Sequence, residues 1–90
     1  MNLQQNHELN RNGILVLLSE VSSAGLTFEM LHSRLYSAGC PMLLRELITY
    51  LDFLEEKAYV NTSRATMAKG VKRYSLSAEG REYLETKGLA

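Results

Sequence analysis

The chain contains few residues that cross-link a fold or interrupt helices and strands. Among its 90 residues it holds one cysteine, Cys40, and one proline, Pro41. A lone cysteine cannot form an intramolecular disulfide, so we expect a reducing, cytoplasmic setting. The scarcity of proline, together with 46% hydrophobic and 22% charged residues, excludes a disordered or collagen-like chain and predicts one that folds.

Long hydrophobic runs are also missing. The longest unbroken apolar stretch runs from Ile14 to Leu18, far short of the ~20 residues that cross a bilayer. The polar N-terminus, with His7, Glu8 and Arg11, does not resemble a secretory signal, so we expect no membrane partner and a mature chain identical to the whole. A chain of this length has material for one core, which predicts a single domain over residues 1–90.

The net charge is zero, whereas domains that bind nucleic acid often carry a large positive excess. The charges are, however, unevenly distributed along the chain. Residues 1–56 hold three arginines against six glutamates and Asp52, a net charge of minus four, and residues 57–90 carry plus four. Between Lys57 and Ala78 five basic residues occur without an acidic one, so this segment is the basic patch of the chain.

Signatures of catalysis and of metal binding are absent from the sequence. There is no Gly-rich phosphate loop and no nucleophile elbow, and the adjacent Glu55 and Glu56 project about 100° apart on a helix, too far to share a proton. His7, His32 and Cys40 lack metal-ligand spacing. We expect no enzyme, no metal and no cofactor, and we favour a small capping or buried role for Cys40 over redox sensing.

Helical spacing of apolar residues predicts three helices in the first two thirds of the chain. The first spans residues 8–21, the second follows Thr27 as its N-cap and ends at Gly39, and the third begins at Cys40 and Pro41 and reaches Lys57. In the third helix we expect five positions to face inward: Leu44, Leu47, Ile48, Leu51 and Leu54.

The pattern changes after Ala58. Residues 59–62 and 71–76 are short runs rich in β-branched and aromatic residues, and a polar stretch separates them, which predicts a β-hairpin with a long tip. Ser77 is expected to cap a last helix that ends at Gly88. The predicted class is mainly α with a small β-hairpin (α+β), a three-helix core followed by the hairpin and a C-terminal helix.

The contiguous apolar stretch of residues 14–18 covers every direction around a helix, so one buried face cannot account for it. It predicts a second packing surface, which we assign to a second copy of the chain. The residues expected in this homodimer interface are Leu9, Ile14, Leu15, Val16 and Leu18.

The order of helix, helix, helix, hairpin and helix is that of a winged helix-turn-helix domain. Residues 51–60, LDFLEEKAYV, resemble the end of a winged-helix recognition helix entering the first wing strand. Residues 73–84, RYSLSAEGREYL, resemble the second wing strand and the next helix of the MarR, PadR and ArsR-like groups. The resemblance spans about Glu8 to Leu84, and it departs from the pattern at Ala58, where glycine is usual, and at Ser77, where threonine is usual.

The resemblance implies a transcriptional regulator that binds double-stranded DNA as a homodimer, with the third helix in the major groove and the hairpin on the phosphates. An arginine can contact guanine bidentately, so Arg45 is the best candidate base reader. Tyr50 and Phe53 are expected on the same outward side of the helix. The expected DNA contacts are Met42, Arg45, Glu46 and Thr49 on the third helix, and Arg64, Thr66, Lys69, Lys72 and Arg73 on the hairpin.

Two other functions stay open. The same fold without DNA binding would be a protein interaction module, which the zero net charge and an outward apolar strip of Met42, Tyr50 and Phe53 favour. A small-molecule sensor requires a pocket, for which so short a chain leaves little volume.

Overall fold

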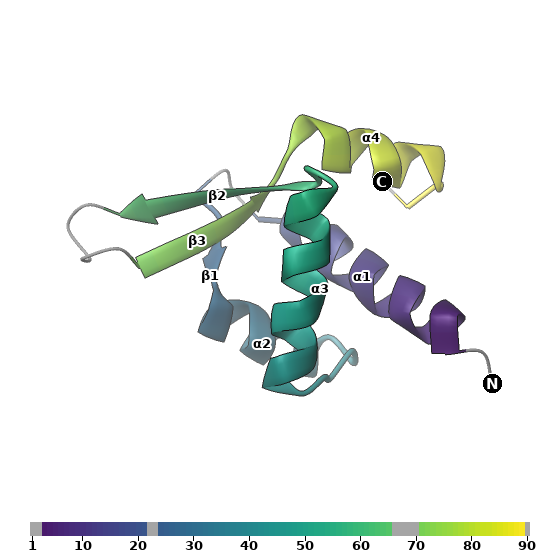
Figure 1. Cartoon of the computed structure of the whole chain (residues 1–90), viewed down its shortest axis with the longest axis horizontal. Coiled ribbons are helices and arrows are strands. Elements are labelled where there is room, and N and C mark those ends of the chain that lie inside the picture. Colours follow the sequence, from purple (N-terminus) through teal and green to yellow (C-terminus); the bar gives the residue numbers. More distant parts are fainter. Residues whose placement is uncertain (1–2, 22–23, 66–70, 90) are drawn as a thin grey trace.

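The structure is a computed structural model that describes residues 3–21, 24–65 and 71–89. It has the predicted mainly helical α+β composition, with a small antiparallel sheet of three strands (Figure 1). None of the helices in this described part has the length and apolar character that crossing a bilayer requires. The elements follow in the order α1 (Leu3–Ser19), β1 (Leu26–Thr27), α2 (Phe28–Ser37), α3 (Leu44–Glu56), β2 (Val60–Ala65), β3 (Val71–Leu76) and α4 (Ala78–Thr86).

The predicted hairpin is confirmed as the antiparallel pair of β2 and β3, in which Val60 pairs with Leu76 and Ala65 with Val71. A third strand, β1, was not expected from the sequence. It pairs with the other edge of β3, so the strand order is β1-β3-β2. The hairpin projects to the left in Figure 1, away from α1 and α4, and its base lies beside the C-terminal end of α3.

The apolar stretch of α1 is buried within the chain itself. Ile14, Leu15 and Leu18 are at most 1% exposed, because α1 packs against α2, α3, α4 and β3 and therefore finds partners in several directions. These three residues are unavailable to a second subunit, which corrects their assignment to a dimer interface. Of the five expected interface residues, Val16 is partly buried and Leu9 is exposed.

The second helix begins as predicted and the third does not. The Thr27 hydroxyl accepts the Met30 N–H at 3.3 Å and caps α2. The Cys40 N–H donates to the Leu35 carbonyl at 2.8 Å, so Cys40 closes α2 and does not start the next helix. The N-cap of α3 is Leu43, whose N–H donates to a carboxylate oxygen of Glu46 at 2.9 Å. The N-terminal end of α3 is therefore held by Glu46.

One junction joins α3, β2 and α4. Ala58, just after α3, has a positive φ of 61°, and the chain then enters β2. The Ser77 hydroxyl donates to the Ala58 carbonyl at 2.6 Å and accepts the Gly80 N–H at 2.9 Å, which confirms Ser77 as the cap of α4. The Ser77 N–H donates to the Tyr59 carbonyl at 3.1 Å. These bonds fix the base of the hairpin against both helices.

Candidate nucleic-acid interface

The outward face of α3 differs from the face that the sequence predicts. Leu47, Tyr50, Leu51 and Leu54 form the buried stripe of this helix. Leu44 and Ile48, expected inside, are 51% and 50% exposed. The true stripe follows the spacing i, i+3, i+4, i+7 from Leu47, which turns Leu44 and Ile48 onto the flank that also carries Glu55. The row opposite the stripe consists of Arg45, Thr49, Asp52 and Glu56, all exposed.

This outward row changes charge along the helix. Arg45 and Thr49 lie in the first turns of α3, and Asp52 and Glu56 lie in the last turns. The Thr49 hydroxyl donates to the Arg45 carbonyl at 2.9 Å. Carboxylates repel a phosphate backbone, so only the N-terminal half of α3 is suited to contact nucleic acid.

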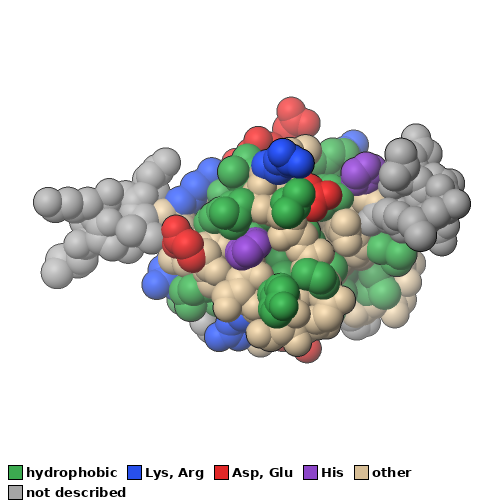
Figure 2. Space-filling view, turned by 90° about the horizontal axis from the view of Figure 1, so that it is seen from below, with side chains coloured by type: hydrophobic (Ala, Val, Ile, Leu, Met, Phe, Trp, Pro, Cys, Tyr) green, Lys and Arg blue, Asp and Glu red, His purple; other side chains and the backbone are tan. Residues whose placement is uncertain are grey.

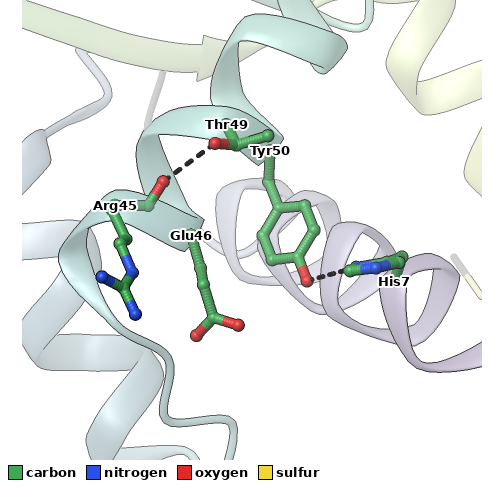
Figure 3. Close-up of a pocket in the computed structure, with 5 residues that line it drawn as sticks. All are labelled: His7, Arg45, Glu46, Thr49 and Tyr50. Atoms are coloured by element: carbon green, nitrogen blue, oxygen red, sulfur yellow. Dashed lines mark hydrogen bonds between the residues drawn. The ribbon is translucent and has the colours of Figure 1, made fainter. Parts of the chain in front are cut away.

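A hollow of about 320 Å³ lies beside that half of the helix. Arg45, Glu46, Thr49 and Tyr50 line it from α3, and His7 lines it from α1 (Figure 3). The Arg45 and Glu46 side chains both extend along it toward the start of α3. The sequence gives no local signal for His7 here, because only tertiary packing brings α1 next to α3.

Tyr50 points toward α1 and not into solvent. Its hydroxyl lies 2.8 Å from Nδ1 of His7 and accepts a hydrogen bond from the Asn10 amide at 3.1 Å. The residue is 5% exposed, so its expected place in an outward apolar strip is wrong. Phe53 is partly buried, under the guanidinium of Arg11. Both side chains are therefore packed against α1.

Met42 does not face outward either. Its side chain is 9% exposed in the core, and its carbonyl lies 3.0 Å from Nε2 of His32. A carbonyl can only accept, so His32 donates this bond and helps to hold the segment before α3. Met42 is thus unavailable for DNA contact, because it packs beneath α3 and does not belong to the helix. Glu46 is half-buried and occupied as the cap of α3.

The two cations of β3 with described side chains are already engaged. The Lys72 ammonium lies 2.8 Å from a carboxylate oxygen of Glu55, and this hydrogen bond raises the pKa of Lys72. Arg73 donates to the Gly25 carbonyl at 3.3 Å. Neighbouring side chains of a strand point to opposite faces, so Lys72 lies on the side of α3 and Arg73 on the other.

The hairpin cations whose side chains the structure describes do not gather at the first turns of α3. Glu55, the partner of Lys72, is ten residues from Arg45, about 15 Å along the helix axis. The backbone of Arg64 pairs with that of Lys72, but its side chain lies outside the described part, as do Thr66 and Lys69 altogether. Figure 2 shows the underside of Figure 1, where lysine and arginine side chains are scattered among apolar and neutral ones.

Cys40 is partly buried beside α1. Its thiol lies 3.7 Å from the Asn10 side-chain oxygen, and burial raises the pKa of the Cys40 thiol. A raised pKa lowers the thiolate fraction at neutral pH, which agrees with a packing role.

No family model, curated protein or solved structure matches this chain.

Proposed function

We propose that this chain is a winged-helix domain that binds double-stranded DNA, with the first turns of α3 in the major groove and the β2–β3 hairpin beside the backbone. The observation that carries the proposal is the exposed pair of Arg45 and Thr49 at the open N-terminal half of a helix that has a projecting hairpin at its other end. The element order, three helices followed by a hairpin and a helix, supports the same assignment.

The proposed contact with bases involves few residues and few base pairs. Arg45 is exposed, and a bidentate arginine–guanine pair contributes about 1–3 kcal/mol of discrimination. The Thr49 hydroxyl already donates to the Arg45 carbonyl, so Thr49 offers its methyl group to a thymine or its oxygen as an acceptor. Asp52 follows on the same row and limits the readout to a few base pairs.

A selection from random duplex DNA at low salt, followed by titration of the enriched duplex, tests the proposal. Arg45→Ala should weaken binding about 5- to 150-fold, the equivalent of 1–3 kcal/mol, and relax the sequence preference at one position. The matched control is Arg81→Ala on α4, which removes the same charge from an exposed site and should change affinity less than twofold. Equal loss in both variants, or no enriched sequence, would contradict base reading by Arg45.

Homodimerisation belongs to this proposal. Leu9, Val16 and Leu89 line an apolar groove of about 350 Å³ between α1 and the end of α2. Two copies paired there by a two-fold axis would present two α3 helices to a pseudo-palindromic site. Sedimentation equilibrium of the chain alone tests the pairing, and a monomer at high concentration would contradict it.

A second candidate is a protein interaction module, and one observation favours it. Leu43, Leu44 and Ile48 are 55%, 51% and 50% exposed; Leu44 and Ile48 are one turn apart on α3, and Leu43 is its N-cap. Apolar side chains grouped on a helix are typical of a protein interface. Retention on random duplex DNA at low salt distinguishes the two functions, because a protein module predicts none and a DNA-binding domain predicts retention that falls steeply with salt.

A further inference from the structure

One flank of α3 leaves apolar side chains open to solvent. Leu44 and Ile48 lie one turn apart on this flank, and about half of each side chain is exposed. Exposed aliphatic side chains that are grouped on a helix are stabilised when a partner surface removes them from water. The flank therefore provides the apolar part of an interface.

Two side chains of opposite charge adjoin this flank. Arg45 and Asp52 belong to the outward row beside it, and both are exposed. They are seven residues apart, which is close to two turns, so they lie on the same side of the helix and about 10 Å apart along its axis. Among the side chains that the structure describes, neither of the two forms an ion pair. Both charges are therefore available to a partner.

The apolar and charged groups together are complementary to a second copy of the same helix. Arg45 is three residues before Ile48 and Asp52 is four residues after it, or about 4.5 and 6 Å along the axis. When two such helices run antiparallel with their Ile48 side chains opposed, Arg45 of each copy comes level with Asp52 of the other to within about 2 Å. Both residues lie on the same side of Ile48, so a two-fold axis brings the opposite charges together.

The same charges disfavour other arrangements. A parallel pair of helices would place Arg45 beside Arg45 and Asp52 beside Asp52, and like charges at close range repel each other. A different partner whose helix carried charges of one sign would match only one of the two residues. The charge pattern therefore favours a second copy of this chain that runs in the opposite direction.

We propose that α3 is a self-association surface on which two copies of the chain pair antiparallel about Ile48. Leu44 and Ile48 form the apolar centre of this contact, and two symmetry-related ion pairs between Arg45 and Asp52 lie along its outward side. So small a contact belongs to the weak, transient class of interfaces, which bury less than about 1,200 Å². It is distinct from pairing at the groove between α1 and α2, because the described lining of that groove contains none of these residues.

Pairing through α3 covers the side chains that are proposed to read DNA. Arg45 would be held by the other copy, and Thr49 lies next to Ile48 in the contact. A paired chain therefore cannot place α3 in the major groove, so self-association and DNA binding exclude each other. This consequence rests on the proposed function, whereas the pairing itself does not.

Sedimentation velocity of the whole chain, without DNA and up to millimolar concentration, tests the pairing. Arg45→Asp opposes two acidic residues in each ion pair and Asp52→Arg opposes two basic ones, so each variant alone should associate about fivefold more weakly or worse. An equimolar mixture of the two variants restores both ion pairs in every mixed dimer and should associate about as strongly as the native chain. Pairing at the α1 groove does not respond to these charges. A mixture that associates no more strongly than either variant alone would overturn the proposal.

A second pair of variants tests the apolar centre. Ile48→Ser should weaken association about fivefold or more, because it removes the side chain at the two-fold axis. Tyr36→Ser is the control, since it removes a larger exposed apolar side chain from α2 outside the contact and should leave association unchanged. Circular dichroism checks the fold of both, and if Ile48→Ser fails to fold, the mixture of charge variants decides. A native chain that stays monomeric throughout, or equal effects of the two serine variants with intact spectra, would contradict pairing through α3.

Discussion

At the scale of single residues, Ala58 is the residue whose type fits its backbone conformation least well. It ends α3 with a φ of 61°, in the left-handed region that an L-residue occupies at a cost of about 1–2 kcal/mol. The winged-helix pattern considered in the sequence analysis expects glycine at this position. The structure supplies the physical reason, since the chain must turn sharply here to bring Tyr59 toward Ser77.

Replacing Ala58 with glycine should therefore stabilise the fold. Glycine removes the steric cost of positive φ but adds unfolded-state entropy, so we expect a net gain of about 0.5–1 kcal/mol in the free energy of unfolding. Urea denaturation followed by circular dichroism measures it. Ala38→Gly is the control, because Ala38 has an ordinary φ of −84° and its replacement should give no gain. A midpoint that falls in Ala58→Gly would contradict the strain argument.

At the scale of elements, the close approach of α4 to the start of β2 depends on Gly80. A Cβ atom at this position would overlap the Tyr59 carbonyl oxygen, which is part of the backbone and cannot rotate away. That same oxygen accepts the Ser77 N–H that anchors α4. Ser77 and Gly80 thus have one structural role, the docking of α4 at the base of the hairpin.

Gly80→Ala should consequently lower the free energy of unfolding, although alanine is the better helix former. We expect a loss of about 1–3 kcal/mol, the usual cost of forcing extra atoms into a packed site. Thermal unfolding compared with Glu82→Ala, an exposed substitution in the same helix, measures the difference. Unchanged stability would show that α4 can shift away from β2 at little cost.

Elements with local signals could be predicted and those set by tertiary packing could not. The starts of α2 and α4 could be predicted from their N-caps Thr27 and Ser77, because each hydroxyl accepts a hydrogen bond from a backbone N–H three residues later. The face of α3 was predicted only in part, since Leu44 and Ile48 fit the same apolar period as the truly buried residues. The two-residue strand β1 forms only because β3 is there to pair with it.

At the scale of the whole molecule, the positions of the charged side chains influence attraction to phosphate more than the net charge of zero does. Of the described cations of β3, Lys72 lies beside α3, where Glu55 pairs with it at 2.8 Å and offsets its charge. Lys72 was predicted from the sequence as a cation of the hairpin, but its partner Glu55 was not, because the two residues are 17 positions apart and meet only in the folded chain. The acidic residues of α3 therefore decide how attractive this side of the molecule is to phosphate.

Glu55→Gln should strengthen binding to duplex DNA under the proposed function. The substitution frees Lys72 and removes a negative charge within a Debye length, about 10 Å at 0.1 M salt, of the hairpin base. One additional phosphate contact should steepen the slope of log K against log salt by about 0.9. Glu85→Gln on α4 changes the net charge equally and should leave that slope unaltered. The lost ion pair is partly exposed and contributes less than about 1 kcal/mol to stability, so both variants should fold. Equal slopes in the two variants would exclude the hairpin base from the DNA contact and restrict it to the first turns of α3.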